Sequence, residues 1–530
     1  MNPWRLSRAR PDLMAAWLIA GSVALQACGS GGGAPRSELR VALATAPISF
    51  DPHATDEIVS FTITSNIYEA LVTTDSGLNP QPGLATKWFN PEPRTWVFDL
   101  AADHHFQDGS PLTSEDVAFS VLRARSDPQS EWGGGLSSVE SVETPSPTRV
   151  VVHTRAPDAT LLQSLAQTLV VPRTSGAIAG SSLRLRPIGS GPYRLESWDP
   201  AAGTARLVAW ARSQAPRPLI THLTFSSVAD DRERVEALLS GRMDLVSDVP
   251  PELAPRVASA PDFRLIDSPS LTEIYLGFDV QRDRTPYASP ARNPFLDRRV
   301  RRAVQAAIDR DALVRDVLSS GGEAAYQPVA PTIFGFDPSL APPPHDVALA
   351  RRLMAEAGFP EGFSVALDAP RASFVGDARV GPFVARSLGD VGIRVELRAL
   401  AKDALFRRLA YRDTSLFISG WNTGSGDMQE VLNFLLHTPD PRRGYGRENS
   451  GGYSNPKLDA LAEEAQQTLN GTRRRDLLRA AAAIAMDDVA WVPLYIPHDR
   501  FAAIRTLSWA PHPDRRLRGA SISFLPEVKP

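Results

Sequence analysis

The sequence predicts an α/β protein built from two lobes, and three observations support this. The chain has 530 residues, more than a single hydrophobic core normally supports. Segments with the two-residue alternation of strands are interspersed with segments that carry apolar residues at helical spacing. Apolar residues make up 43% of the chain, which is enough for more than one core. Such alternation of strands and helices is typical of α/β lobes.

The first 27 residues have the pattern of an export signal. Arg5, Arg8 and Arg10 form a positive patch, and an apolar run follows at residues 13–25. That run is too short to cross a hydrocarbon core, which needs about 20 apolar residues. We therefore expect residues 1–27 to be a signal peptide that is removed on export.

Cys28 follows this apolar region and is the only cysteine of the chain. Leu25-Gln26-Ala27-Cys28 resembles the lipobox of bacterial lipoproteins, in which the cysteine is lipidated and becomes the new N-terminus. The resemblance implies lipidation at Cys28 and anchoring to a membrane; an incidental thiol is the alternative. The glycine-rich residues 28–37 are expected to form a flexible tether.

Composition limits the partners that the protein can have. Removal of residues 1–27, which hold three arginines and one aspartate, takes the formal charge from −3 to −5. A mildly acidic chain lacks the basic face of nucleic-acid-binding proteins, so no nucleic-acid partner is expected. A single cysteine cannot build a thiolate metal site, and the nine histidines are scattered, so neither a metal nor a cofactor is expected.

The first half of the chain begins with strand and helix signals in turn. Residues 39–43 read as a strand, and residues 58–71 carry apolar side chains at helical spacing. Residues 95–100 alternate with period two and predict a half-buried strand. Further predicted elements are a helix from Ser114, capped by Thr113 or Ser114, a strand at 150–153 and a helix at 231–239 that ends before Gly241.

The second half contains the longest helical signal, at residues 297–318. Val300, Val304 and Ile308 belong to its apolar face. The elements predicted after it are helices at 346–357, 458–470 and 473–486 and a strand at 492–496.

Five short stretches of residues 38–500 form a recognisable series. They are Leu84-Ala85-Thr86-Lys87-Trp88, Phe106–Val117 (FQDGSPLTSEDV), Pro187–Tyr193 (PIGSGPY), Asn293–Arg310 with its NPFLD start, and Gly452-Tyr453-Ser454-Asn455-Pro456 with Asp459. In this order they resemble motifs of the extracytoplasmic solute-binding proteins of family 5, the peptide/nickel/oligopeptide class of ABC importers.

The resemblance implies a two-lobed clamshell, the type II periplasmic-binding-protein fold, with an extra subdomain. Lobe I is expected at 38–272 and 496–530, with the subdomain at 72–186, and lobe II at 273–495. The chain then crosses between lobes near residues 274–278 and 492–496, and these crossings are expected to act as a hinge. A peptide-like or other small polar solute is expected to bind between the lobes, in a monomeric protein that delivers it to the importer's membrane subunits.

The resemblance also implies a set of ligand-contacting residues. Ser419–Asp427 matches the main ligand loop of the family in lobe II. Within it Trp421 suits stacking, and Asn422 and Thr423 suit hydrogen bonding. The candidates in lobe I are Phe50, Tyr68, Trp132 and Arg173, for which core packing or a surface position is the alternative.

One position departs from the peptide-binding members of the family. They place an aspartate about three residues after this tryptophan, where it holds the α-ammonium group of the peptide. Here that position is Gly424, and the nearest acid is Asp427. Either Asp427 takes over the role through a shifted loop, or the ligand lacks a free N-terminal amine. The sequence favours the second interpretation.

Two other classes of function are possible from the sequence alone. A secreted hydrolase is one, although the chain has no Gly-x-Ser-x-Gly elbow and no His-Glu-x-x-His motif. A relative of the binding proteins that acts as a sensor or chaperone, without coupling to transport, is the other.

Overall fold

A computed structural model describes residues 36–177, 182–215, 217–371 and 377–526. The predicted signal peptide, Cys28 and most of the predicted tether therefore lie outside the described residues. The contacts between residues group Ser37–Pro530 into one compact unit and do not divide it into lobes. The lobe boundaries therefore stay predictions. No helix in the described ranges is both long enough and apolar enough to cross a membrane.

The main feature of the fold is a sheet to which twelve strands of the described chain belong. Its order is β16-β15-β17-β13-β18-β11-β1-β10-β9-β8, and β12 and β14 also pair with β18. The strands are β1 (Glu38–Leu43), β8 (Tyr193–Asp199), β9 (Thr204–Ala209), β10 (His222–Ser227), β11 (Leu245–Val246), β12 (Phe263–Pro269), β13 (Thr272–Phe278), β14 (Gly322–Ala324), β15 (Phe363–Pro370), β16 (Ile393–Leu400), β17 (Leu416–Asn422) and β18 (Trp491–Ile504).

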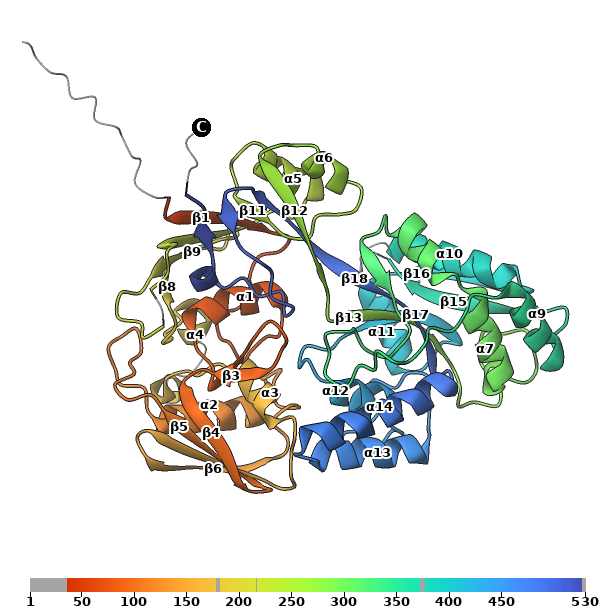
Figure 1. Cartoon of the computed structure of the whole chain (residues 1–530), viewed down its shortest axis with the longest axis horizontal. Helices are drawn as coiled ribbons and strands as arrows, with labels where there is room; N and C mark the ends of the chain where they lie inside the picture. The colour runs from red at the N-terminus through yellow and green to blue at the C-terminus, as the bar shows by residue number, and fades with distance from the viewer. Residues whose placement is uncertain (1–35, 178–181, 216, 372–376, 527–530) are drawn as a thin grey trace, which may run out of the picture. The chain divides into compact units, whose positions relative to one another are not determined.

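Strand β18 joins the two halves of this sheet. Residues 491–497 pair with β13 and β14, and residues 498–504 pair with β12, while β11 pairs at 502–503. Figure 1 shows β18 running from the helices at its start toward β11 and β12. The two segments predicted to cross between lobes are thus neighbouring antiparallel strands of one sheet.

A second sheet has the order β4-β5-β7-β6 and lies within the segment predicted as the extra subdomain. Helices α2 and α3 pack against it around a core of its own, which includes Phe98, Val117 and Leu165. The strands of this region are β2 (Val72–Thr74), β3 (Pro80–Pro82), β4 (Ala85–Glu92), β5 (Thr95–Leu100), β6 (Val139–Ser146) and β7 (Arg149–Thr154).

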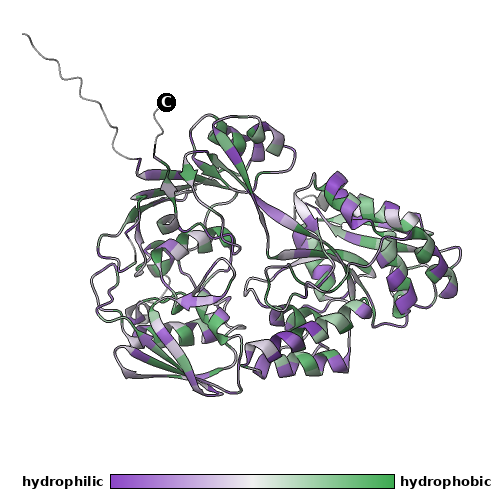
Figure 2. Ribbon diagram, in the orientation of Figure 1, coloured by the Kyte–Doolittle hydropathy of each residue, from purple (hydrophilic) through white to green (hydrophobic). Residues whose placement is uncertain are grey.

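Helices pack against the sheets, and α13 and α14 combine buried apolar residues with exposed polar ones. Figure 2 shows hydrophobic and hydrophilic residues mixed along α13 and α14, and the buried ones of α14 include Leu477, Leu478 and Ala481. The α-helices are α1 (Ile58–Ile67), α2 (Ser114–Ser126), α3 (Leu161–Gln167), α4 (Ser182–Leu185), α5 (Asp231–Leu239), α6 (Ala254–Ala258), α7 (Arg298–Ala307), α8 (Arg310–Ala312), α9 (Val347–Glu356), α10 (Asp377–Gly389), α11 (Lys402–Ala410), α12 (Gln429–Val431), α13 (Pro456–Gln467) and α14 (Gly471–Asp487).

Three helices differ from the sequence prediction. The helix expected at 458–470 is α13 (Pro456–Gln467), which ends three residues early because Thr468 is extended and Asn470 is the N-cap of α14. The helix expected at 58–71 ends at Ile67, because Tyr68 is extended and Ala70 forms a β-bridge with Leu169. The helix expected at 297–318 is interrupted after α7. Asp309 is extended there and its carboxylate accepts the amide of Ala312 at 2.9 Å, so a new helix begins.

Candidate functional site

Residues 421–427, which comprise the last two residues of β17 and the loop after it, are called the β17 loop below. Trp421 is half-buried at its start, and its Nε1 donates to Oε1 of Glu430 at 3.1 Å. The amide of Ser425, near the loop's far end, donates to Oε2 of the same carboxyl at 3.2 Å. Burial raises the pKa of Glu430. One carboxyl therefore holds both ends of the loop.

The middle of the β17 loop contacts two other segments. Asn422 is exposed and donates to Oγ1 of Thr272 at 3.0 Å, and Thr423 is buried with its amide bonded to the carbonyl of Leu271. The carbonyl of Gly424 accepts a hydrogen bond from Gln167, at the end of α3, at 3.0 Å. The subdomain predicted for lobe I thus contacts the loop predicted for lobe II.

Asp427 is fully buried and paired inside the protein. Its two carboxylate oxygens accept bonds from Arg474 of α14 at 2.6 and 2.8 Å, a bidentate geometry. One oxygen also accepts the amide of Gln429 at 2.9 Å. Arg474 therefore balances the charge of the Asp427 carboxylate, whose hydrogen bonds are made to other groups of the protein.

Phe50 and Tyr68 lie together in a hydrophobic core. Their exposed fractions are 2% and 1%, and the Tyr68 hydroxyl donates to the carbonyl of Phe50 at 3.2 Å. The Phe50 ring meets Trp198 edge-on at 5.5 Å between centroids. Burial raises the pKa of Tyr68 well above its usual value.

Trp132 and Arg173 occupy different surroundings. The half-buried Trp132 packs on Phe61 at 5.0 Å between centroids, and its Nε1 donates to the carbonyl of Pro52 at 2.9 Å. It therefore lies beside the loop that carries Phe50. Arg173 is exposed and forms an ion pair with Glu115 at 3.0 Å.

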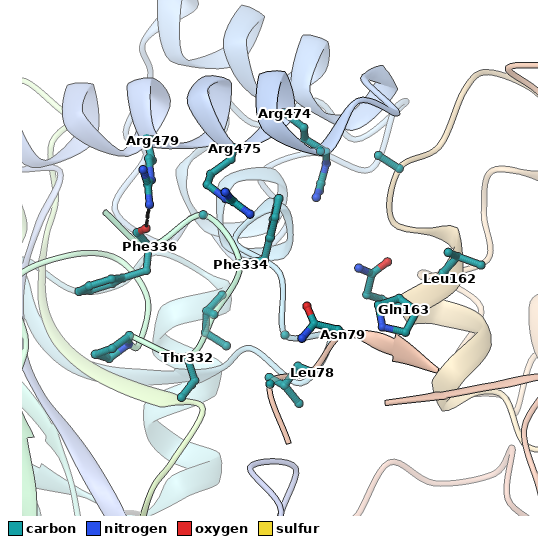
Figure 3. A pocket seen from close by; sticks show the side chains of 18 of the residues that line it. Leu78, Asn79, Leu162, Gln163, Thr332, Phe334, Phe336, Arg474, Arg475 and Arg479 are labelled. Atoms are coloured by element: carbon teal, nitrogen blue, oxygen red, sulfur yellow. Dashed lines mark hydrogen bonds between the residues drawn. The ribbon is translucent and has the colours of Figure 1, made fainter. Parts of the chain in front are cut away.

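A cavity of about 640 Å³ lies beside the β17 loop. Its walls come from the β2–β3 hairpin and α3 on one side and from the 331–338 loop and α14 on the other (Figure 3). The lining residues are Gly77, Leu78, Asn79, Pro80, Trp96, Ala159, Leu162, Gln163, Pro331, Thr332, Ile333, Phe334, Gly335, Phe336, Pro338, Gly426, Leu469, Gly471, Arg474, Arg475 and Arg479. Through Gly426 the β17 loop is part of this wall.

The eight residues predicted to contact ligand do not line this cavity. Asp427 and Trp421 adjoin it through the β17 loop, whereas Phe50, Tyr68 and Trp132 cluster around the loop after β1. Sequence reasoning missed Arg475 and Arg479. The signal that could have found them is arginines four apart on a helix, which therefore share a face.

Fold and site together define a class, the two-lobed α/β binding proteins that hold a small solute. The chain belongs to the bacterial extracellular solute-binding proteins of family 5, whose model matches residues 79–442. Its role is solute binding outside the cytoplasm, of the kind that serves ABC importers, and it is not an enzyme. The hydrolase alternative is therefore wrong.

Individual relatives are distant. The chain is 25% identical to the glutathione-binding protein GsiB of Escherichia coli O1:K1 over 471 residues, 87% of this chain and 89% of that protein. It superposes on HbpA2 of Haemophilus parasuis with a TM-score of 0.81 and 21% identity, covering 92% of this chain and 99% of HbpA2. The superposition on DppA of Helicobacter pylori, solved with the peptide STSA, has a TM-score of 0.75 at 19% identity. It covers 92% of this chain and 98% of DppA.

Proposed function

We propose that this protein is the membrane-anchored receptor of an ABC importer and that its solute needs no free α-amine for recognition. The observation that carries the proposal is the charge around the β17 loop. Gly424 offers no carboxylate, and the nearby carboxylate of Asp427 is buried against Arg474. An ammonium group brought to this loop would meet no unpaired aspartate.

The β17 loop supports a solute in other ways. Trp421 supplies a flat apolar surface, and its position is fixed by Glu430. Asn422 is exposed at the strand end and can bond a polar solute. The candidates in lobe I are still Phe50, Tyr68, Trp132 and Arg173. They would contact the solute when the lobes close.

GsiB is named for glutathione, and DppA was solved with a tetrapeptide. The test is calorimetric titration of the exported chain with glutathione, trialanine and N-acetyl-trialanine. We expect glutathione binding that Trp421→Ala weakens at least about tenfold, a loss of about 1.4 kcal/mol. We expect acetylation to change trialanine binding little, and Gly424→Asp to create a preference for the free amine.

Two results would contradict the proposal. The first is wild-type protein that binds trialanine and loses most of that affinity on acetylation. The second is a Trp421→Ala variant that binds every member of the panel as well as wild type does. A ligand at a hundred times its Kd should also stabilise the fold by about 2.7 kcal/mol, which thermal unfolding can check.

Anchoring, oligomeric state and coupling to transport belong to the same proposal. Cys28 is the proposed lipidation site, and Cys28→Ser should release the protein from membranes and abolish labelling by radioactive palmitate. The proposed monomer is checked by light scattering. Genes for two membrane subunits and ATPases beside this one would favour transport over the sensor or chaperone role.

A further inference from the structure

The cavity beside the β17 loop has an unusual balance of charge. Three arginines of α14 line it, and no aspartate or glutamate does within the described part of the chain. Arg474 is neutralised by Asp427. The cavity wall therefore carries the charges of Arg475 and Arg479.

Neither of these two guanidinium groups forms an ion pair among the described residues. Across the ranges that the structure describes, no carboxylate lies within ion-pairing distance of Arg475 or Arg479. Arg479 donates twice to the carbonyl of Phe336, at 3.1 and 2.8 Å, which leaves Nη1 without a hydrogen bond to the described residues. Asp337, on the same loop, accepts from Ser339, and these bonds together with the nearby charge of Arg479 lower the pKa of its carboxyl.

The 331–338 loop contacts both cations, Arg475 through the Phe334 ring and Arg479 through the Phe336 carbonyl. The Arg475 guanidinium lies 5.1 Å from the ring centroid of Phe334. Figure 3 shows Arg475 and Arg479 reaching from α14 toward Phe334 and Phe336. The rings and the neighbouring Ile333 provide apolar area for the carbon part of a ligand.

Amide side chains occupy the opposite wall. Asn79 from the β2–β3 hairpin and Gln163 from α3 line the cavity and extend into the same space in Figure 3. Oε1 of Gln163 is buried and has no hydrogen-bond partner in the described structure. A buried acceptor left unpaired is costly, and a ligand donor would satisfy it.

We infer that this cavity is a subsite for a carboxylate of the solute, held by Arg475 and Arg479, and that a hydrogen-bond donor elsewhere on the same solute meets Oε1 of Gln163. A guanidinium matches a carboxylate in shape and charge, and it is worth most where no competing acid is present. The inference rests on the proposed function, since it names the acidic group that such a solute would carry. It also explains how a solute could be recognised without its amine.

The test is calorimetric titration of the exported chain with citrate at low ionic strength, with triethyl citrate as the uncharged comparison. Arg475→Ala and Arg475→Lys are the test variants. Arg473→Ala is the matched control, since Arg473 is an exposed arginine of the same helix that pairs with Glu464 at 2.9 Å and does not line the cavity.

We expect citrate to bind the wild type and Arg473→Ala alike, and to bind Arg475→Ala at least about tenfold more weakly. Arg475→Lys keeps the charge but loses the two-pronged guanidinium geometry, so its citrate affinity should lie between those of wild type and Arg475→Ala. Any of three results overturns the inference. Citrate binds wild type and Arg475→Ala equally well, or its affinity falls equally in Arg473→Ala and Arg475→Ala, or wild type does not bind citrate at millimolar concentration. Trp421→Ala tests the proposed function separately, because Trp421 does not line the cavity.

Discussion

Two parts of α14 carry the same residue type and differ in what surrounds it. Arg474 is buried and bonded to Asp427, whereas Arg475 is exposed beside Phe334 and lacks an acidic partner among the described residues. The first arginine ties α14 to the β17 loop, and the second is available to a ligand. The partner, and not the residue type, therefore decides whether a charge near the site stabilises the fold or is free to bind a solute.

The largest effect is expected from breaking the buried pair. Asp427→Ala leaves the Arg474 guanidinium buried without its carboxylate, so we expect a loss of about 3–5 kcal/mol in the free energy of unfolding. Urea denaturation measures it. Replacing both partners by apolar residues, as in Asp427→Leu with Arg474→Met, should recover most of that loss. A single-variant loss below about 1 kcal/mol would mean that the pair does not hold the loop.

A smaller effect is expected at the carboxyl that holds the β17 loop. Glu430→Ala removes the acceptor of Trp421 Nε1 and of the Ser425 amide, so we expect a loss of about 1–3 kcal/mol. The indole should also move, and tryptophan fluorescence of the variant should differ from that of wild type. Unchanged stability and emission would argue against this role.

A third test uses a buried acid that has no cation beside it among the described residues. Glu273 of β13 accepts a hydrogen bond from Trp491 at 3.2 Å, and burial raises its pKa well above the usual range. A raised pKa in the folded state means that stability is fully present at low pH and falls as pH rises past the ordinary glutamate value.

We therefore expect Glu273→Gln to remove this loss. Relative to wild type, the stability of the variant should rise from about pH 5 to about pH 8. Thermal unfolding at both values measures the difference. If the stabilities of the variant and of wild type changed in parallel with pH, Glu273 would not be the group that lowers stability at high pH.

The smallest effect is expected from the unpaired arginine. Arg475→Ala removes an exposed side chain with no ion pair in the described structure, so the free energy of unfolding should change by about 0.5 kcal/mol or less. Arg474→Ala is the matched variant one residue earlier and should lose several-fold more. Similar losses of unfolding free energy in Arg474→Ala and Arg475→Ala would contradict the different roles given to the two arginines.

Local patterns predicted much of the fold. Helix α5 has the predicted bounds, 231–239, because an apolar face, an N-cap at Asp230 and a terminal Gly241 are all local signals. The motif series predicted the family correctly. The break after α7 was missed, since the apolar pattern runs on through Asp309 and only the cap geometry shows the new start.

The site was harder to predict because its decisive contacts are distant in sequence. Asp427 was considered as a ligand residue from its place in the loop, but its partner Arg474 lies 47 residues later. The cavity likewise combines α3, the 331–338 loop and α14, which no local periodicity connects. The absence of acids from its wall becomes visible only when these segments are brought together.

Native mass spectrometry of the mildly purified protein shows whether solute recognition depends on the unpaired arginines of α14 rather than on an amine-binding aspartate. We expect one retained small molecule per chain that carries a carboxylate, at similar occupancy in wild type and Arg473→Ala and at strongly reduced occupancy in Arg475→Ala. A retained solute without an acidic group, or an acidic one whose occupancy is the same in Arg475→Ala, would contradict it.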